Sequence, residues 1–199
     1  MKRFFHAAAA VLVLAAGAVL AVPNADAKGL RLFDFKPGEF ANVVTGGSAR
    51  YHLAYTLTNA GEEARKPAVR VELRTETDKT YGDHFDAAAA KLAADAAGRE
   101  TPYQSSAQIR RSDLEGGASV DGLAQFGRID PNADELEVRV YGLWDPIVRT
   151  TKGVFSERRV LVLKFSRAGD EYDRQDDPIR LVSSKEELEG EPTLIHGGD

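Results

Sequence analysis

The segment Asp83-His84-Phe85-Asp86 is the most suggestive short cluster of reactive side chains in the sequence. An imidazole between two carboxylates can be oriented as a general base, and the same groups can hold a metal ion. The catalytic hypothesis is a hydrolase that uses Asp83 and Asp86 as an acid/base pair. The competing interpretation is structural, because Asp83 would close the turn after Tyr81-Gly82 and Asp86 would cap a helix. We favour the structural interpretation.

A second cluster consists of five carboxylates within eight positions near the C-terminus. They are Asp170, Glu171, Asp173, Asp176 and Asp177. Ca²⁺ takes six to eight oxygen ligands, and extracellular sites bind it with dissociation constants of about 10⁻⁴ to 10⁻³ M. A Ca²⁺ site in the 170–177 loop is therefore one hypothesis. The loop lacks the EF-hand spacing and its turn glycine, and acidic runs of this kind are usually solvated.

Aromatic side chains mark the third candidate site. The segment Tyr141-Gly-Leu-Trp144-Asp-Pro146 follows a predicted strand and contains the only tryptophan of the chain. Aromatic residues on loops often anchor partner proteins, so Tyr141 and Trp144 are the candidate binding residues. An anchor requires an exposed Trp144, whereas the alternative is a ring packed over the edge of the core.

No recognisable catalytic motif occurs elsewhere in the sequence. Gly-x-Ser-x-Gly, a phosphate-binding glycine-rich loop and His-Glu-x-x-His are all missing. The chain has no cysteine, which excludes thiol catalysis and thiolate metal sites. His52, His84 and His196 lack the close spacing typical of a zinc site. We expect His52 to be a partly exposed sheet residue and His196 to be solvated, and we predict that the protein is not an enzyme.

Residues 1–27 have the three parts of a secretory signal peptide. Two basic residues precede the apolar run Ala7–Val22, and the segment ends in the small-x-small sequence Ala25-Asp26-Ala27. The run is shorter than the roughly 20 residues of a membrane-spanning helix. We therefore predict a secreted or periplasmic protein that begins at Lys28 and has no membrane span after cleavage. Without a cysteine at the cleavage site, an acyl anchor there is excluded.

The net negative charge of the chain argues against nucleic acid as a partner. The chain has a net charge of −5, and removal of Lys2, Arg3 and Asp26 changes it to −6. No basic cluster with interleaved aromatic residues is present, so nucleic acid is not an expected partner. The 172 residues that remain after residue 27 suffice for one domain with a substantial core.

The elements that must position these residues are mostly strands, because apolar and polar residues alternate with a period of two. The predicted strands cover residues 30–35, 50–58, 69–75, 120–126, 135–141 and 159–165. The first ends at Lys36-Pro37-Gly38. The last has two apolar faces, which predicts a central position in its sheet.

One segment departs from the strand pattern. The alanine-rich residues between Asp86 and Gly98 favour a short helix, with Asp86 as N-cap and Gly98 just past its end. A helix this short must pack on a sheet to be stable. We read it as an insertion between two strands of an antiparallel sandwich. The domain covers residues 28–182, and residues 183–199 form a polar, mobile tail with at most one helical turn.

Two stretches resemble immunoglobulin-like sandwich domains of secreted bacterial proteins of unknown function. The first is Tyr51–Asn59, a strand that ends in Thr-Asn before a glycine turn. The second is Gly117–Phe126, followed by Ile129-Asp-Pro131 and the strand Glu135–Tyr141. The resemblance implies a mainly β, antiparallel immunoglobulin-like β-sandwich and carries no catalytic motif, so it implies no activity.

These observations predict an exported, non-catalytic β-sandwich that acts as a binding or structural module. Its partner would be a protein, an envelope component or its own copies, bound through sheet edges or the loop around Trp144. A Ca²⁺-dependent module that uses the 170–177 loop is the alternative.

Overall fold

The computed structural model describes residues 29–167 and 179–197. In this part of the chain the elements are β1 (Phe33–Thr45), β2 (Ser48–Asn59), β3 (Arg70–Thr75), β4 (Thr80–Gly82), α1 (Ala87–Ala96), α2 (Ser106–Ile109), β5 (Ser119–Gly127), β6 (Glu135–Tyr141), β7 (Ile147–Thr150), β8 (Gly153–Ser156), β9 (Arg159–Arg167), β10 (Ile179–Leu188) and β11 (Thr193–Gly197). The protein is mainly β, as predicted.

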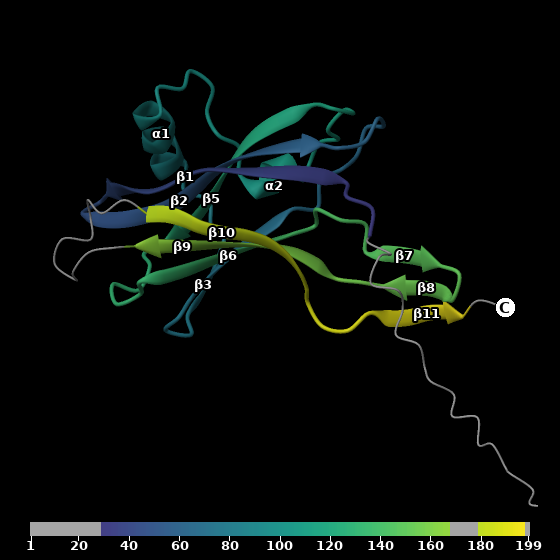
Figure 1. Cartoon of the computed structure of the whole chain (residues 1–199). Coiled ribbons are helices and arrows are strands. Elements are labelled where there is room, and N and C mark those ends of the chain that lie inside the picture. The colour runs from purple at the N-terminus through teal and green to yellow at the C-terminus, as the bar shows by residue number, and fades with distance from the viewer. Residues whose placement is uncertain (1–28, 168–178, 198–199) are drawn as a thin grey trace, which may run out of the picture.

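The strands form three antiparallel sheets, in the orders β1-β2-β5, β10-β9-β6-β3-β4 and β11-β8-β7. The first two lie across one another, an arrangement consistent with a β-sandwich, and the small third sheet projects from one end (Figure 1). β9 lies between β10 and β6, so the central position predicted for residues 159–165 is confirmed.

Side chains from the first two sheets form one hydrophobic core. Phe40 of β1 contacts Phe165 of β9 edge to face, with ring centroids 4.9 Å apart and ring planes at 89°. Such an aromatic pair contributes roughly 0.5–1.5 kcal/mol beyond the burial of its surface. Leu53 of β2 and Val138 of β6 are completely buried in the same core.

β1 is longer than predicted. The chain continues past Pro37 through an irregularity in register between Pro37 and Phe40, and it then pairs with β2 as far as Thr45. Proline is tolerated there because β1 is an edge strand. Gly46 and Gly47 join the two strands with φ of 56° and 76°, as a tight two-residue turn with both φ values positive requires.

Helix α1 occupies the alanine-rich segment. The Asp86 carboxylate accepts hydrogen bonds from the backbone N–H groups of Ala88 and Ala89. Ala90 and Ala93 pack against Leu123 of β5. The helix therefore covers the outer surface of the β1-β2-β5 sheet (Figure 1).

The prediction of an irregular tail from Ser183 is wrong. Ser183 and the residues up to Leu188 pair with β9 as part of β10, and Thr193–Gly197 pairs with β8 as β11. Backbone hydrogen bonds hold an edge strand, which therefore needs few apolar side chains. The polar sequences of β10 and β11 for this reason did not indicate strands. The predicted domain boundary at residue 182 falls inside β10.

Candidate functional site

The carboxylates of the Asp83–Asp86 cluster accept hydrogen bonds that hold the local fold together. Asp83 accepts a 3.0 Å hydrogen bond from the backbone N–H of Gln125 and another from the Ser106 hydroxyl. Asp86 caps α1. His84 is exposed, and its backbone N–H donates a 2.8 Å bond to the Gln125 carbonyl. The Asp83 carboxylate thus fastens this segment to β5 and the Asp86 carboxylate caps α1, and no described hydrogen bond joins either of them to the His84 imidazole.

His52 is buried, and the prediction of a partly exposed residue is wrong. It is 8% exposed, and its Nδ1 has no hydrogen-bond partner among the residues that the structure describes. Burial lowers the pKa of the imidazole, while the backbone of Arg50 and the charge of Glu39 act in the opposite direction. In register His52 lies between Ala41 and Gln125, and Gln125 bonds in turn to the Asp86 backbone. Strand alternation cannot show that Gln125, the neighbour of His52, is held by the Asp86 backbone.

The two candidate aromatic residues lie along one groove at the end of the sandwich. The groove has a volume of about 450 Å³. Its apolar lining includes Leu32, Phe33, Ala68, Gly142 and Pro146, together with Tyr141 and Trp144. The structure thus brings the end of β6 and the loop after it beside residues 66–70, more than seventy positions earlier in the chain.

Trp144 is held against the core. Its side chain is 7% exposed, and the Arg31 guanidinium lies 5.5 Å from the ring centroid. The flanking backbone is also fixed, since the Leu32 N–H donates a 2.8 Å hydrogen bond to the Leu143 carbonyl. An exposed, projecting anchor is therefore the wrong description of Trp144. Its ring contributes to the wall of a groove.

Tyr141 is buried to the same extent and is fixed on both sides. The Arg70 guanidinium lies 4.1 Å from its ring centroid. Its hydroxyl donates to Glu189 at 3.1 Å and accepts from Arg139 Nε at 3.3 Å. The ring is thus a preorganised surface between Arg70 and a small apolar cluster with Val160 and Val162.

Cationic side chains outnumber carboxylates in the groove lining. The charged lining residues are Lys66, Arg70, Arg158, Arg159 and Glu157. Glu157 is 8% exposed and forms an ion pair with Arg159 at 2.6 Å, so its charge is neutralised locally. Lys66 is exposed and has no ion pair within the described part of the chain. An anionic group is the complement of this lining.

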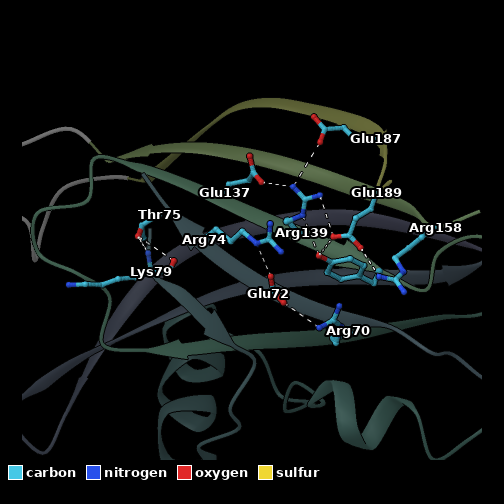
Figure 2. A network of polar contacts seen from close by, with 11 residues as sticks. Arg70, Glu72, Arg74, Thr75, Lys79, Glu137, Arg139, Arg158, Glu187 and Glu189 are labelled. Carbon is cyan, nitrogen blue, oxygen red and sulfur yellow. Dashed lines mark hydrogen bonds and ion pairs between the residues drawn. The ribbon is translucent and has the colours of Figure 1, made fainter. Parts of the chain in front are cut away.

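Arg70 and Arg158 connect the groove to a network of ion pairs on the outer face of the five-stranded sheet. Figure 2 shows Glu72 between Arg70 and Arg74, and Arg139 close to Glu137, Glu187 and Glu189. Arg158 contacts Glu189 at 3.2 Å. Arg70 and Arg158 therefore each have a carboxylate partner, and each side chain remains more than half exposed.

A second depression lies farther along the same outer face, with a volume of about 620 Å³. Its charged lining residues are Arg74, Glu76, Glu135, Glu137 and Lys164. Charges of both signs alternate there, and no Trp or Tyr of the described ranges lines it. We therefore place the candidate binding site in the groove beside Trp144.

The proposed Ca²⁺ ligands, Asp170, Glu171, Asp173, Asp176 and Asp177, lie outside the described residues. In residues 29–167 and 179–197, no group of three or more His, Asp or Glu side chains could hold a metal ion.

Comparison with protein-family models, curated proteins and solved structures finds no match to the chain. None of the helices in the described ranges has the length and apolar character needed to cross a membrane.

Proposed function

We propose that this chain is an exported, non-catalytic binding module of immunoglobulin-like type, and that its groove beside Trp144 holds an anionic group of a protein or envelope component. The observation that carries the proposal is the composition of the groove. Two fixed aromatic rings lie beside four cationic side chains, and the one carboxylate among the described lining residues already pairs with Arg159.

This arrangement suits recognition in two ways. Tyr141 and Trp144 lose little conformational entropy on binding, because packing already holds their rings. Lys66 and Arg158 are exposed and can turn toward a ligand carboxylate or phosphate. The apolar lining favours a ligand whose anionic group is attached to an uncharged body.

The test is a titration of the chain that begins at Lys28 with a glutamate-rich peptide and, separately, with a lysine-rich peptide of equal length. Trp144 is the only tryptophan and lines the groove, so its fluorescence reports occupancy directly. Before titration its emission should be blue-shifted and poorly quenched by acrylamide, as its burial requires. We expect a change in emission with the acidic peptide only.

Lys66→Glu and Arg158→Glu should each weaken binding of the acidic peptide about tenfold, which corresponds to about 1.4 kcal/mol. The matched control is Lys36→Glu, which reverses an exposed charge on β1 outside the groove lining. Equal binding of both peptides, or equal losses in the groove variants and the control, would reject the groove as the site.

A further inference from the structure

The carboxylate of Glu189 contacts two residues of the groove lining. Its Oε1 atom accepts a 3.1 Å hydrogen bond from the Tyr141 hydroxyl. Its Oε2 atom accepts a 3.2 Å hydrogen bond from the Arg158 guanidinium, and Figure 2 shows the two side chains next to each other. The rim of the groove therefore already carries an anionic group that belongs to this chain.

The backbone fixes Glu189 in this position. Its N–H donates a 2.8 Å hydrogen bond to the Arg158 carbonyl oxygen, directly after the last β10–β9 pair, Leu188 with Arg159. Gly190 follows with φ of 83°, a conformation that glycine adopts without strain, and the chain continues to β11. Residue 189 thus stays beside residue 158 whatever side chain it carries.

The two partners of the ion pair differ in their freedom to move. The Glu189 side chain is 27% exposed, whereas the Arg158 side chain is 71% exposed. Arg139 also lies 3.8 Å from the Glu189 carboxylate. Partial burial alone would raise the pKa of Glu189, but its hydrogen-bond and ion-pair partners lower it overall, so the carboxylate is charged at neutral pH. A fixed anion thus holds a mobile arginine.

We propose that Glu189 is an internal competitor of the ligand in the groove beside Trp144. It holds Arg158 at the rim, and an anionic ligand binds by drawing the guanidinium away from it. This inference rests on the proposed function, because it concerns access to the same groove. A ligand must replace the Glu189 carboxylate as the partner of Arg158, so the groove selects carboxylate or phosphate groups over neutral polar groups.

Two substitutions separate the charge of Glu189 from its contact with Tyr141. Glu189→Gln removes the charge and keeps an acceptor oxygen for the Tyr141 hydroxyl. It should bind the acidic peptide about threefold more tightly than the wild type, on the scale of one exposed ion pair. Glu189→Ala should gain less, because the Tyr141 hydroxyl also loses its acceptor. A gain is diagnostic, since replacing a residue of purely structural importance weakens binding.

Titration of the chain from Lys28 with the glutamate-rich peptide, followed by Trp144 fluorescence, measures these affinities. The matched control is Glu187→Gln, which removes the same charge from the end of β10. Glu187 pairs with Lys185 and Arg139 and forms no printed contact with the groove lining. Its substitution should leave the affinity unchanged. Thermal unfolding verifies that each variant is folded.

A second measurement requires no peptide. Phenylglyoxal reacts with accessible, unpaired guanidinium groups, and mass spectrometry should show faster labelling of Arg158 in Glu189→Gln than in the wild type or Glu187→Gln. Equal or weaker peptide binding by Glu189→Gln, or unchanged labelling of Arg158, would overturn the proposal. Binding of the acidic peptide by the wild type would then still support the proposed function. If neither the wild type nor Glu189→Gln binds the peptide, the proposed function and this inference fail together.

Discussion

The guanidinium of Arg167 donates a 2.8 Å hydrogen bond to the backbone carbonyl oxygen of Asp130. Arg167 is 1% exposed, and it also donates to the carbonyl oxygens of Pro131 and Ala133 and to the Tyr51 hydroxyl. No carboxylate pairs with it among the described residues. The buried arginine thus ties the end of β9 to the loop before β6.

Arg167→Met should lower the free energy of unfolding by about 3 kcal/mol, because the hydrogen bonds of the buried guanidinium are lost and a hydrogen bond to a charged group contributes roughly 1.5–3 kcal/mol. Urea denaturation measures the change. Arg149→Met is the control, since Arg149 is exposed on β7. A loss no larger than that of the control would show that water or the backbone can replace the guanidinium.

Gly122 on β5 cannot carry a side chain without displacing Tyr55. The two residues are directly opposite in register, and a Cβ atom at position 122 would lie 2.2 Å from the Tyr55 ring. Tyr55 is buried, so its ring has little room to move. We expect Gly122→Ala to lower the free energy of unfolding by about 1–3 kcal/mol.

The control for this substitution is Gly82→Ala, because a Cβ atom at position 82 meets no atom within 4 Å. Thermal unfolding of both variants makes the comparison. Similar melting temperatures for the two would contradict the close packing of Tyr55 over β5.

His52 should make stability depend on pH. Burial lowers its pKa in the folded state below the ordinary 6.5 of the unfolded chain. Between these two values the unfolded state binds more protons, so stability rises with pH and reaches its full value above 6.5. Below 6.5 it is progressively lost until the folded-state pKa is passed.

Denaturant unfolding at several pH values, with the wild-type chain and His52→Leu, measures this dependence. The His52→Leu variant should lose the contribution of His52 to the pH dependence of the free energy of unfolding. His84→Asn, which changes an exposed imidazole, should keep that contribution. Parallel profiles for the wild type and His52→Leu would exclude His52 as the cause.

Calcium separates the proposed function from its alternative. A module that binds Ca²⁺ through residues 170–177 would release or absorb heat and melt at a higher temperature in millimolar calcium. We expect neither change for the anion-binding module. If a shift is observed, Asp173→Asn with Asp176→Asn should abolish it, whereas Asp95→Asn on α1 should not.

Most of the sandwich could be predicted from the sequence, because its central strands have a buried face and an exposed face. β3, β6 and the second half of β2 follow that alternation, whereas five consecutive residues of β5 are buried. The helix could be predicted as well, since alanine propensity and the Asp86 cap act locally. β10 and β11 could not be predicted. Pairing with β9 and β8 holds them in place, and their own sequences show no apolar periodicity.

The candidate site was predictable only in part. Tyr141 and Trp144 were identified from their residue types, but Lys66 and Arg70 belong to a segment far away in the sequence. Only the folded arrangement of β3, β6 and β9 places the cationic residues beside the rings. Arg167 had no signal at all, because the carbonyl groups that it binds form a cluster only after the turn at residues 130–133 has folded.

The contact between Phe40 and Phe165 has a consequence for the order of folding. The two rings are 125 positions apart, and β10, which completes that sheet, comes still later in the chain. The centre of the molecule therefore cannot close until nearly the whole polypeptide is available, and contacts this distant make folding slow. A chain that passed through a translocation channel with its N-terminus first would stay unfolded and transportable until its last strands emerged.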